Sequence, residues 1–396
     1  MQKLAIMGGK PVRKKLLPYG RQHVDEQDVQ AVVDVLRSDY LTTGPKISEF
    51  EQEIAKYVGV KFAVAVSNGT AALHMAAFAA GIGPGDEVLV PALTFAASSN
   101  CVLYMGAKPV FVDIDEYTLN IDLADLESKI SPKTKAIIPI DFTGQSVDID
   151  QIMAIAKKHN LIVIEDAAHA LGSKYKGEPV GLKAHMTMFS FHPVKPITTG
   201  EGGIIVTNDE TYYHRMLMFR THGITKIKEC MTNYHGPWYY EQQFLGYNYR
   251  LTDFQAALGL SQMKKLDSFI QRRQEIANLY RAKLGKLKGI SIPKEEGFSS
   301  SGWHLYIIQL DLDVIRGTQK EIFEALHAEN IGVMVHYLPV YLHPYYRSLG
   351  YQKGLCPIAE KVYNRMISLP IFPLMTEADV EDVVKALRKV MTYYYI

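Results

Sequence analysis

Short runs of apolar residues recur along the first half of the chain, and helical patterns or long connections separate most of them. Apolar runs of this length, bounded by polar positions, predict buried strands. The seven runs are residues 62–66, 87–90, 109–112, 136–140, 161–164, 186–189 and 203–207. Residues 122–130 and 149–159 carry helical patterns between them. Short strands that alternate with helices predict an α/β fold, in which a mostly parallel sheet is covered on both faces.

The pattern becomes irregular at residues 221–243, a segment rich in Tyr, His and Gly. Loops of this length are usually functional or disordered. The aromatic side chains favour an ordered lid or a contact surface, and they are Tyr234, Trp238, Tyr239 and Tyr240.

Residues 252–284 form one long helical pattern, with a break near Asp267 as an alternative, and are interpreted as the link to a second domain. The strand and helical patterns beyond this link are residues 305–310, 318–329, 332–336 and 377–391. We therefore expect a large domain over residues 1–265 and a smaller C-terminal α/β domain over residues 266–396.

Composition and charge narrow the possible partners. Hydrophobic residues make up 47% of the 396 residues and charged residues 21%, as in an ordinary soluble protein, and the net charge is +1. This balance creates no field that favours nucleic acid or an anionic membrane. No apolar run is long enough to cross a bilayer, and the N-terminal segment has too short an apolar core for a signal peptide. We expect a cytoplasmic protein without nucleic-acid or membrane partners.

The cysteines are Cys101, Cys230 and Cys356. A sparse, odd set without C-x-x-C spacing fits a reducing compartment and argues against structural zinc. We therefore expect no metal site.

Residues 67–72 combine a strand end, a glycine turn and a helix start. Free N–H groups at a helix N-terminus bind phosphate, and a hydroxyl such as that of Thr70 adds a donor. The spacing matches neither of the common glycine-rich nucleotide loops. Ordinary helix capping by Ser or Thr is the alternative that this segment alone leaves open.

Two acids, Glu165 and Asp166, end a predicted buried strand. Ligands of open α/β sheets bind at that edge. A buried carboxylate there needs a cationic partner, because without one it takes up a proton. Capping of the following helix by Asp166 explains the segment equally well.

Lys195 lies in a loop, residues 190–203, that joins two predicted strands. The prolines on either side remove backbone donors, so the loop has a defined shape and is not helical. A lysine held beside buried strands loses hydration, which lowers its pKa and suits a Schiff base. A solvated surface lysine is the alternative.

Together these three segments predict a cofactor. Pyridoxal 5′-phosphate (PLP) requires a phosphate anchor, a carboxylate that keeps its ring nitrogen protonated, and a lysine for the Schiff base. The chain offers a phosphate seat at residues 67–72, then Asp166, then Lys195. This order predicts a PLP-dependent enzyme.

Four segments, residues 67–72, 165–169, 190–203 and 246–251, resemble the sugar aminotransferases of the DegT/DnrJ/EryC1/StrS family. The resemblance extends over nearly the whole chain. It implies a fold-type I PLP-dependent aminotransferase, with a seven-stranded mostly parallel sheet in a large domain and a smaller C-terminal domain. The seven apolar runs agree with that architecture.

The resemblance implies roles for single residues. Lys195 is similar to the family's Schiff-base lysine and Asp166 to the partner of the pyridine nitrogen, so both are expected to be catalytic. His169 resembles the residue at the cofactor's phenolic oxygen, and Phe95 the aromatic residue that stacks on the ring. The residues that resemble the phosphate ligands are Gly69, Thr70 and Ser190.

A homodimer with shared active sites is also implied. Asn248 resembles an asparagine that reaches the cofactor phosphate of the neighbouring subunit. It lies between a long aromatic loop and a long helical pattern, a poor position for a ligand of its own subunit. Aromatic residues such as Tyr234 and Trp238 are enriched at interfaces.

Within the family, residues 190–199, 243–250 and 335–340 resemble aminotransferases of pseudaminic acid biosynthesis. These enzymes aminate carbon 4 of a UDP-linked 4-keto-6-deoxy-N-acetylhexosamine, and L-glutamate is the expected amino donor. Spore-coat polysaccharide aminotransferases share the resemblance, so another nucleotide-linked keto sugar is an alternative acceptor. The candidate sugar contacts, for which ordinary turn and strand roles have equal weight, are Thr43, Gly44, His336 and Tyr337.

Two other functions compete with transamination. Relatives with His in place of the lysine dehydrate keto sugars, and Lys195 argues against that reaction. A non-catalytic regulator that binds cofactor or sugar would usually lack the lysine or carry a DNA-binding segment, and neither is seen in the sequence.

Overall fold

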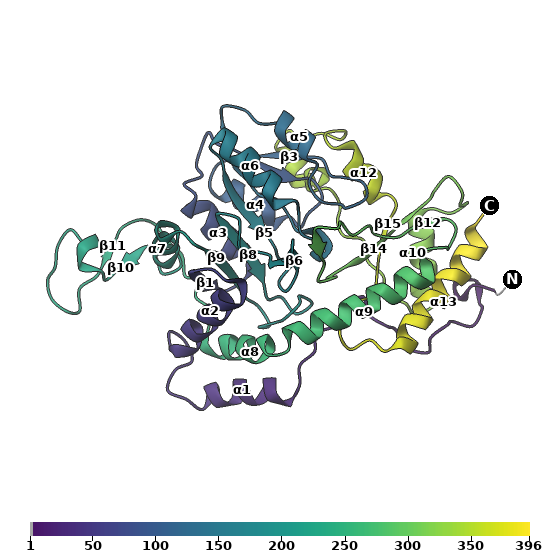
Figure 1. Ribbon diagram of the computed structural model, residues 1–396, viewed down its shortest axis with the longest axis horizontal. Coiled ribbons are helices and arrows are strands. Elements are labelled where there is room, and N and C mark those ends of the chain that lie inside the picture. The colour runs from purple at the N-terminus through teal and green to yellow at the C-terminus, as the bar shows by residue number, and fades with distance from the viewer. Residues whose placement is uncertain (1–2) are drawn as a thin grey trace.

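The computed structural model describes residues 3–396 and has a seven-stranded sheet at its centre (Figure 1). The strands, in spatial order, are β1 (Phe62–Val66), β9 (Gly203–Thr207), β8 (Met186–Ser190), β5 (Ile162–Asp166), β4 (Thr134–Ile137), β2 (Glu87–Pro91) and β3 (Lys108–Val112). All run parallel except β9, which is antiparallel to β1 and β8. Each strand overlaps one of the predicted apolar runs, which confirms the α/β fold with a mostly parallel sheet.

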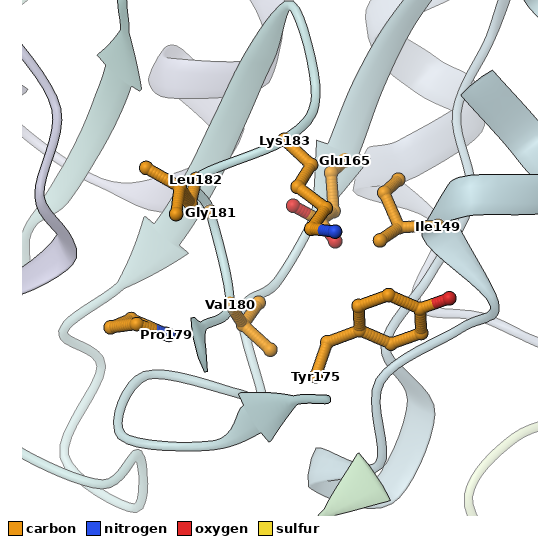
Figure 2. Close-up of a pocket in the computed structure, with 8 residues that line it drawn as sticks. All are labelled: Ile149, Glu165, Tyr175, Pro179, Val180, Gly181, Leu182 and Lys183. Carbon is orange, nitrogen blue, oxygen red and sulfur yellow. The ribbon is translucent and has the colours of Figure 1, made fainter. Parts of the chain in front are cut away.

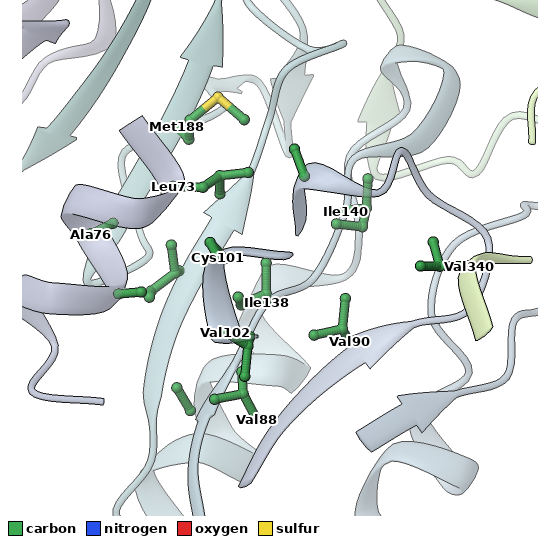
Figure 3. Packing of buried hydrophobic residues seen from close by; sticks show 14 of the residues in the cluster. Leu73, Ala76, Val88, Val90, Cys101, Val102, Ile138, Ile140, Met188 and Val340 are labelled. Carbon is green, nitrogen blue, oxygen red and sulfur yellow. The ribbon is translucent and has the colours of Figure 1, made fainter. Parts of the chain in front are cut away.

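Helices cover both faces of the sheet, and every residue of a central strand such as β8 is therefore buried. The helices on one face are α3 (Gly69–Ala79), α4 (Ala97–Tyr104) and α7 (Glu210–Phe219). Figure 3 shows part of this layer, where Leu73 of α3 and Val102 of α4 belong to the same apolar cluster as Val88 and Val90 of β2. The helices of the other face are α2 (Pro45–Val58), α5 (Leu123–Ser128), α6 (Ile149–His159) and α8 (Asp253–Met263). The sheet edge is left open between these layers.

The long helical pattern at residues 252–284 is two helices. α8 ends at Met263, and α9 (Leu266–Leu284) begins after Lys264 and Lys265. This break lies close to Asp267, where the sequence offered one. In Figure 1, α9 runs from beneath the sheet to the C-terminal region.

The C-terminal region has its own small sheet and its own apolar cluster. Its main elements are β12 (Ile290–Ser291), β14 (Tyr306–Leu310), α10 (Gln319–Ala328), α11 (Pro344–Ser348), α12 (Pro357–Tyr363), β15 (Met366–Leu369) and α13 (Glu377–Tyr394). Leu4 and Leu17 pack in this cluster, and the buried Glu329 accepts hydrogen bonds from the N–H groups of Ala5 and Val12. The N-terminal segment therefore lies against the C-terminal region, and the division at residues 265 and 266 stays a prediction.

The strand predicted at residues 332–336 is wrong. The segment makes one isolated bridge, between Met334 and Ser368, and the strand in that place is β15. Gly332 instead donates its N–H to the carbonyl of Leu17, and a β-carbon at Gly332 would lie 2.7 Å from that oxygen. The segment is thus held between the N-terminal segment and β15, and it does not continue a ladder with either.

Residues 221–243 form an arm that projects from the body of the protein at the left of Figure 1. A short hairpin of β10 (Ile224–Thr225) and β11 (Glu241–Gln242) forms its base. Glu241 accepts hydrogen bonds from the N–H groups of Thr232 and Asn233. Trp238 is 75% exposed. The arm is an ordered element with exposed aromatic side chains, one of the two forms expected for it.

The described residues contain no helix that is long and apolar enough to span a bilayer. Over the same residues, no group of three or more His, Cys, Asp or Glu side chains is placed to hold a metal ion.

Candidate active site

The carboxyl ends of the parallel strands open into a cavity of about 740 Å³. This is the edge of an α/β sheet at which ligands bind. The predicted site residues that line the cavity are Gly69, Thr70, Phe95, Asp166, His169, Ser190, Lys195, His336 and Tyr337. They follow four different strands of the sheet or belong to the C-terminal region, so the fold gathers them from distant parts of the sequence.

The N-terminus of α3 forms an anion seat at one end of the cavity. Asn68 caps the helix by accepting from the N–H of Ala71 at 2.8 Å. Among residues 3–396, the N–H groups of Gly69 and Thr70 have no acceptor. Together with the helix dipole and the hydroxyl groups of Thr70 and Ser190, they provide donors for a phosphate.

Two glycines allow the backbone before α3 to approach β8 and β9 closely. A β-carbon on Gly203, the first residue of β9, would lie 2.6 Å from the carbonyl group of Asn68. At Gly69 a β-carbon would lie 3.2 Å from that of Ser190. The backbone before α3 therefore packs directly against β8 and β9, which brings the Ser190 hydroxyl to the helix N-terminus.

Asp166 ends β5 and is 5% exposed. Its Oδ2 accepts from Ser98 Oγ at 2.7 Å, and its Oδ1 accepts from the N–H of Ala168 at 3.2 Å. Burial raises the pKa of Asp166, and the bonds from Ser98 and Ala168 and the charge of Lys195 oppose this rise. Glu165 points to the opposite face, because successive strand residues alternate. Asp166 is therefore the carboxylate of this strand that faces the cavity.

Lys195 reaches the same cavity from a compact loop. Its N–H donates to the carbonyl of His192, and Phe191 pairs with Gly202 and Thr199 to close the loop. The side chain is partly exposed to the cavity, and within residues 3–396 its Nζ makes no hydrogen bond or ion pair. Burial lowers the pKa of Lys195 from 10.5 to about 8, although the charge of Asp166 opposes this. An amine with this pKa is substantially neutral near pH 8 and can act as a nucleophile.

We expect the apoprotein to show this pKa directly. A neutral amine reacts with aldehydes and a protonated amine does not, so the rate should rise with pH and reach half its maximum near pH 8. An unperturbed lysine, with a pKa of about 10.4, requires a more alkaline solution. Reductive labelling with formaldehyde and cyanoborohydride, read by peptide mass spectrometry, measures the rate at each lysine. A Lys195 peptide that reaches half its maximal rate only above pH 10 would contradict the lowered pKa.

His169 and His304 lie ring against ring, with centroids 4.3 Å apart. The Nδ1 atoms of both are buried and have no hydrogen-bond partner in the described part of the chain. Burial lowers the pKa of His169 well below its ordinary value, and the charges of Lys195 and His336 act in the same direction. Both rings are therefore neutral, and a buried imidazole nitrogen without a partner is characteristic of a site that holds a polar ligand.

Aromatic and imidazole rings form the side of the cavity next to the C-terminal region. Phe95 is 60% exposed, with its ring centroid 5.9 Å from that of Tyr337. His336 Nδ1 lies 2.8 Å from Ser368 Oγ, and the ring of Tyr19 packs on His336 at 5.4 Å. Burial lowers the pKa of His336 to about 4. Phe95 thus presents an open ring face on which a planar ligand can stack.

Three predicted residues, Thr43, Gly44 and Asn248, lie outside this cavity. Gly44 precedes α2, and its N–H donates to Asp253 Oδ2 at 2.8 Å. Asn248 is exposed and pairs with Thr221 at the base of the arm. Their roles stay predictions, and for Asn248 the expected site belongs to a second subunit.

Several residues that line the cavity were not predicted from the sequence. Three of them are Tyr19, Ser98 and His304. Ser98 had a usable signal, since it follows the strand end that also carries Phe95 and so belongs to the same sheet edge. Tyr19 and His304 had none, because they reach the cavity through the packing of the N-terminal and C-terminal segments.

Comparison with known proteins identifies the family. The model of the DegT/DnrJ/EryC1/StrS aminotransferase family matches residues 22–388. The chain belongs to this family. It is an aminotransferase, and PLP is its cofactor; similar solved structures include a putative sugar aminotransferase of Streptococcus pneumoniae in PLP and PMP forms.

Several proteins similar to this aminotransferase have names that refer to sugar or polysaccharide biosynthesis. It is 43% identical over 381 residues to the spore coat polysaccharide biosynthesis protein SpsC of Bacillus subtilis. The match covers 96% of this chain and 98% of SpsC. The chain is 39% identical to a UDP-4-amino-4-deoxy-L-arabinose–oxoglutarate aminotransferase of Shewanella sediminis, over 95% of this chain and 98% of the relative. The solved Helicobacter pylori PseC, an aminotransferase in the biosynthesis of pseudoaminic acid, is 33% identical, with a TM-score of 0.89 over 96% of this chain and all of PseC.

The cavity residues fit PLP. The free N–H groups of Gly69 and Thr70 suit its phosphate, and Asp166 suits its ring nitrogen. Nδ1 of His169 and the amine of Lys195 have no partner in the part of the chain that the structure describes, so the first suits an oxygen substituent and the second the aldehyde carbon.

Proposed function

We propose that this aminotransferase moves an amino group from L-glutamate to carbon 4 of a UDP-linked 4-keto-6-deoxy-N-acetylhexosamine, in the biosynthesis of pseudaminic acid or a related surface polysaccharide. The observation that carries the reaction class is the meeting of Lys195, Asp166 and the α3 N-terminus in one cavity. The acceptor is supported by the likeness to PseC. An oxoglutarate-dependent relative supports glutamate, since 2-oxoglutarate is the keto acid that glutamate leaves behind.

Bound PLP supplies an aldehyde that exchanges between amines and a protonated ring that accepts electrons. In our proposal, Asp166 stays ionised and accepts the hydrogen bond of the ring nitrogen. The α3 N-terminus holds the phosphate. In the first half of the reaction, Lys195 would take the proton from the substrate carbon and deliver it to carbon C4′ of the cofactor. In the second half it would move a proton the other way, from C4′ to carbon 4 of the sugar. A pKa of about 8 suits both directions, because the amine is then neither fully protonated nor fully neutral near neutral pH.

The decisive experiment is a panel of nucleotide-linked keto sugars, supplied with glutamate to the purified enzyme. We expect turnover of the UDP-linked 4-keto-6-deoxy-N-acetylhexosamine, with 2-oxoglutarate as the second product. The spore-coat relative supports a second candidate, another nucleotide-linked keto sugar, and the same panel would reveal it. Turnover of simple 2-oxo acids alone, with no sugar nucleotide accepted, would defeat the proposal.

Tyr337 lines the cavity and is proposed to contact the sugar. Loss of one hydrogen bond of about 1 to 1.5 kcal/mol corresponds to roughly a tenfold change in affinity. We therefore expect Tyr337→Phe to raise the KM for the sugar nucleotide about tenfold while the KM for glutamate changes little. Tyr345→Phe, at an exposed site outside the cavity, is the matched control. Equal changes in both KM values would remove Tyr337 from the sugar site.

We also propose a homodimer with two shared sites. The arm exposes Trp238, and Leu245 next to its base is 77% exposed. Asn248 pairs with Thr221 at the base of the arm, is exposed, and does not line the cavity of its own chain. A second copy of the chain would cover these apolar side chains. Asn248 of each copy would then reach the phosphate seat of the other copy.

Subunit mixing tests this arrangement. Lys195→Ala and Asn248→Asp are each expected to be nearly inactive, because aspartate at 248 repels phosphate. A mixed dimer places both lesions in one site and leaves the other intact, so each heterodimer should regain about half of a wild-type dimer's activity. An Asn248→Asp homodimer that works normally, or demonstrated exchange without recovery, would show that Asn248 does not act across the interface.

A further inference from the structure

Three carboxyl groups are buried together where β4 and β5 end. Asp141 is fully buried, Glu165 is 1% exposed and Asp166 is 5% exposed. The N–H of Asp141 donates to the carbonyl of Asp166, which ties the two backbones together at this point. Asp166 faces the PLP cavity, whereas Glu165 points to the other face of the sheet.

The surroundings of Glu165 contain few groups that could compensate a charge. Figure 2 shows Glu165 at a small pocket of about 10 Å³, with Tyr175, Lys183 and Ile149 around it. Lys183 does not pair with it, because its Nζ lies 2.9 Å from Asp150 and 3.4 Å from Glu178. Thr187 Oγ1 donates to Glu165 Oε2 at 2.8 Å. The backbone of Gly181 also stabilises the charged form of Glu165, but neutral donors are weak partners for a buried carboxylate.

Asp141 is compensated even less. Its Oδ1 accepts from the N–H of Val147 at 2.9 Å. Its Oδ2 is buried and accepts no hydrogen bond from a donor among the described residues. The carboxyl of Glu165 is within hydrogen-bonding reach of Asp141. A single proton between the two acids would satisfy this otherwise isolated oxygen.

The electrostatics of this cluster also favour a proton on one of the carboxyl groups. Burial raises the pKa of Asp141 well above its ordinary value, and the charge of Glu165 raises it further. Burial raises the pKa of Glu165 as well, against the hydrogen bonds from Thr187, Asp141 and the backbone of Gly181. The cation that acts on the cluster from the cavity side, Lys195, faces Asp166. Three ionised carboxylates in this space would therefore be costly.

We propose that Asp141 and Glu165 share one proton and together keep one negative charge behind Asp166, which strengthens its hold on the proton of the cofactor's ring nitrogen. This role rests on the proposed function of Asp166. Asp141 and Glu165 are positioning residues, since neither lines the PLP cavity. The proton sits on Asp141 Oδ2 and is donated to Glu165. A nearby negative charge raises the proton affinity of an acid and stabilises a cation, so it favours the protonated ring.

Infrared spectroscopy of the holoenzyme tests the shared proton. The variants are Asp141→Asn, Glu165→Gln and the double variant. Each single amide keeps the shape and a hydrogen-bond donor but leaves one carboxylate. We expect the wild type to show, near pH 7, a C=O band of a protonated carboxyl that both single variants lack. A band that remains in Asp141→Asn and in Glu165→Gln, or no such band in the wild type, would overturn the shared proton.

Magnetic resonance of PLP with an isotope-labelled ring nitrogen tests the charge. Both single variants keep the negative charge, so their nitrogen signal should match that of the wild type. The double variant removes only the charge, and its signal should move towards that of an unprotonated ring. Its kcat should fall by on the order of tenfold, the effect of about one pKa unit. If the double variant has the ring-nitrogen signal and the kcat of the wild type, Asp141 and Glu165 have only a structural role, and the proposal is overturned.

The same measurement separates this proposal from the function on which it rests. Asp166→Asn should move the nitrogen signal further than the double variant does. If Asp166→Asn leaves the signal unchanged, Asp166 is not the ring partner, and the supporting role falls with it. The infrared result is independent of this outcome, because it reports on the proton between Asp141 and Glu165 alone.

Discussion

Replacing Lys195 with alanine is expected to reduce transamination by at least about 10⁴-fold, because in the proposed mechanism one amine provides both the covalent attachment and the proton transfer. No other lysine lines the cavity in residues 3–396, so no neighbour can take over. Cofactor retention is expected to weaken as well, since the covalent link is lost while the phosphate seat remains. Initial rates with the sugar nucleotide and glutamate measure the first effect, and dialysis followed by absorbance measures the second.

The control for Lys195→Ala is Lys320→Ala, at a side chain that is 82% exposed on α10. It should behave as the wild type. In the wild type, borohydride should fix the cofactor to the peptide that contains Lys195, because it reduces the carbon–nitrogen double bond. A labelled peptide without Lys195, or a Lys195→Ala enzyme with near-normal turnover, would assign the reaction to another amine.

Asp166→Asn is expected to lose on the order of 10³-fold or more in kcat, comparable to removing a main electrostatic stabiliser. Asparagine fits the space and can still accept from Ser98, but it carries no charge to keep the ring nitrogen protonated. PLP should still bind, because Lys195 and the α3 N-terminus are untouched. Single-turnover rates and the absorbance of the bound cofactor separate these two effects.

Asp209→Asn is the matched control for Asp166→Asn. Asp209 caps α7 by accepting from Thr211 and Tyr212, and asparagine caps a helix as well as aspartate does. Its activity should equal that of the wild type. Near-normal turnover of Asp166→Asn would place the partner of the ring nitrogen elsewhere and would remove the reason for a buried carboxylate at this strand end.

The strands of the central sheet were predictable because each is an apolar run with polar limits. A parallel strand is covered by helices on both faces, so nearly all of its side chains must be apolar. The segment at residues 332–336 has a similar composition, but it is not a strand. Whether an apolar segment joins a ladder depends on the partner that lies beside it. The backbone of Gly332 pairs with that of Leu17, and the segment forms a backbone bridge to β15 at Met334.

The candidate site was predictable to the extent that its residues follow strand ends. Asp166 and the loop of Lys195 come directly after predicted strands, and parallel strands end at one edge of the sheet. The contact of Ser98 with Asp166 and the position of His304 at the cavity were not predictable, because their partners are distant in sequence. Ser98 bonds to a carboxylate 68 positions away. The spacing of residues within a short segment cannot predict a contact between segments so far apart in the sequence.

From the sequence alone came the α/β fold, the strands, the order of phosphate seat, carboxylate and lysine, and the family resemblance. These follow from local patterns of burial and from motifs, which a chain carries residue by residue. The structure shows that Asp166, the acid singled out by the resemblance, faces the cavity and that burial lowers the pKa of Lys195 there. The tertiary structure alone decided that Asp141 lies behind Asp166, with a buried oxygen that has no partner among residues 3–396. The pKa of a buried group depends on every neighbour within a few ångströms. Those neighbours come from separate strands, so they are defined only when the sheet has formed.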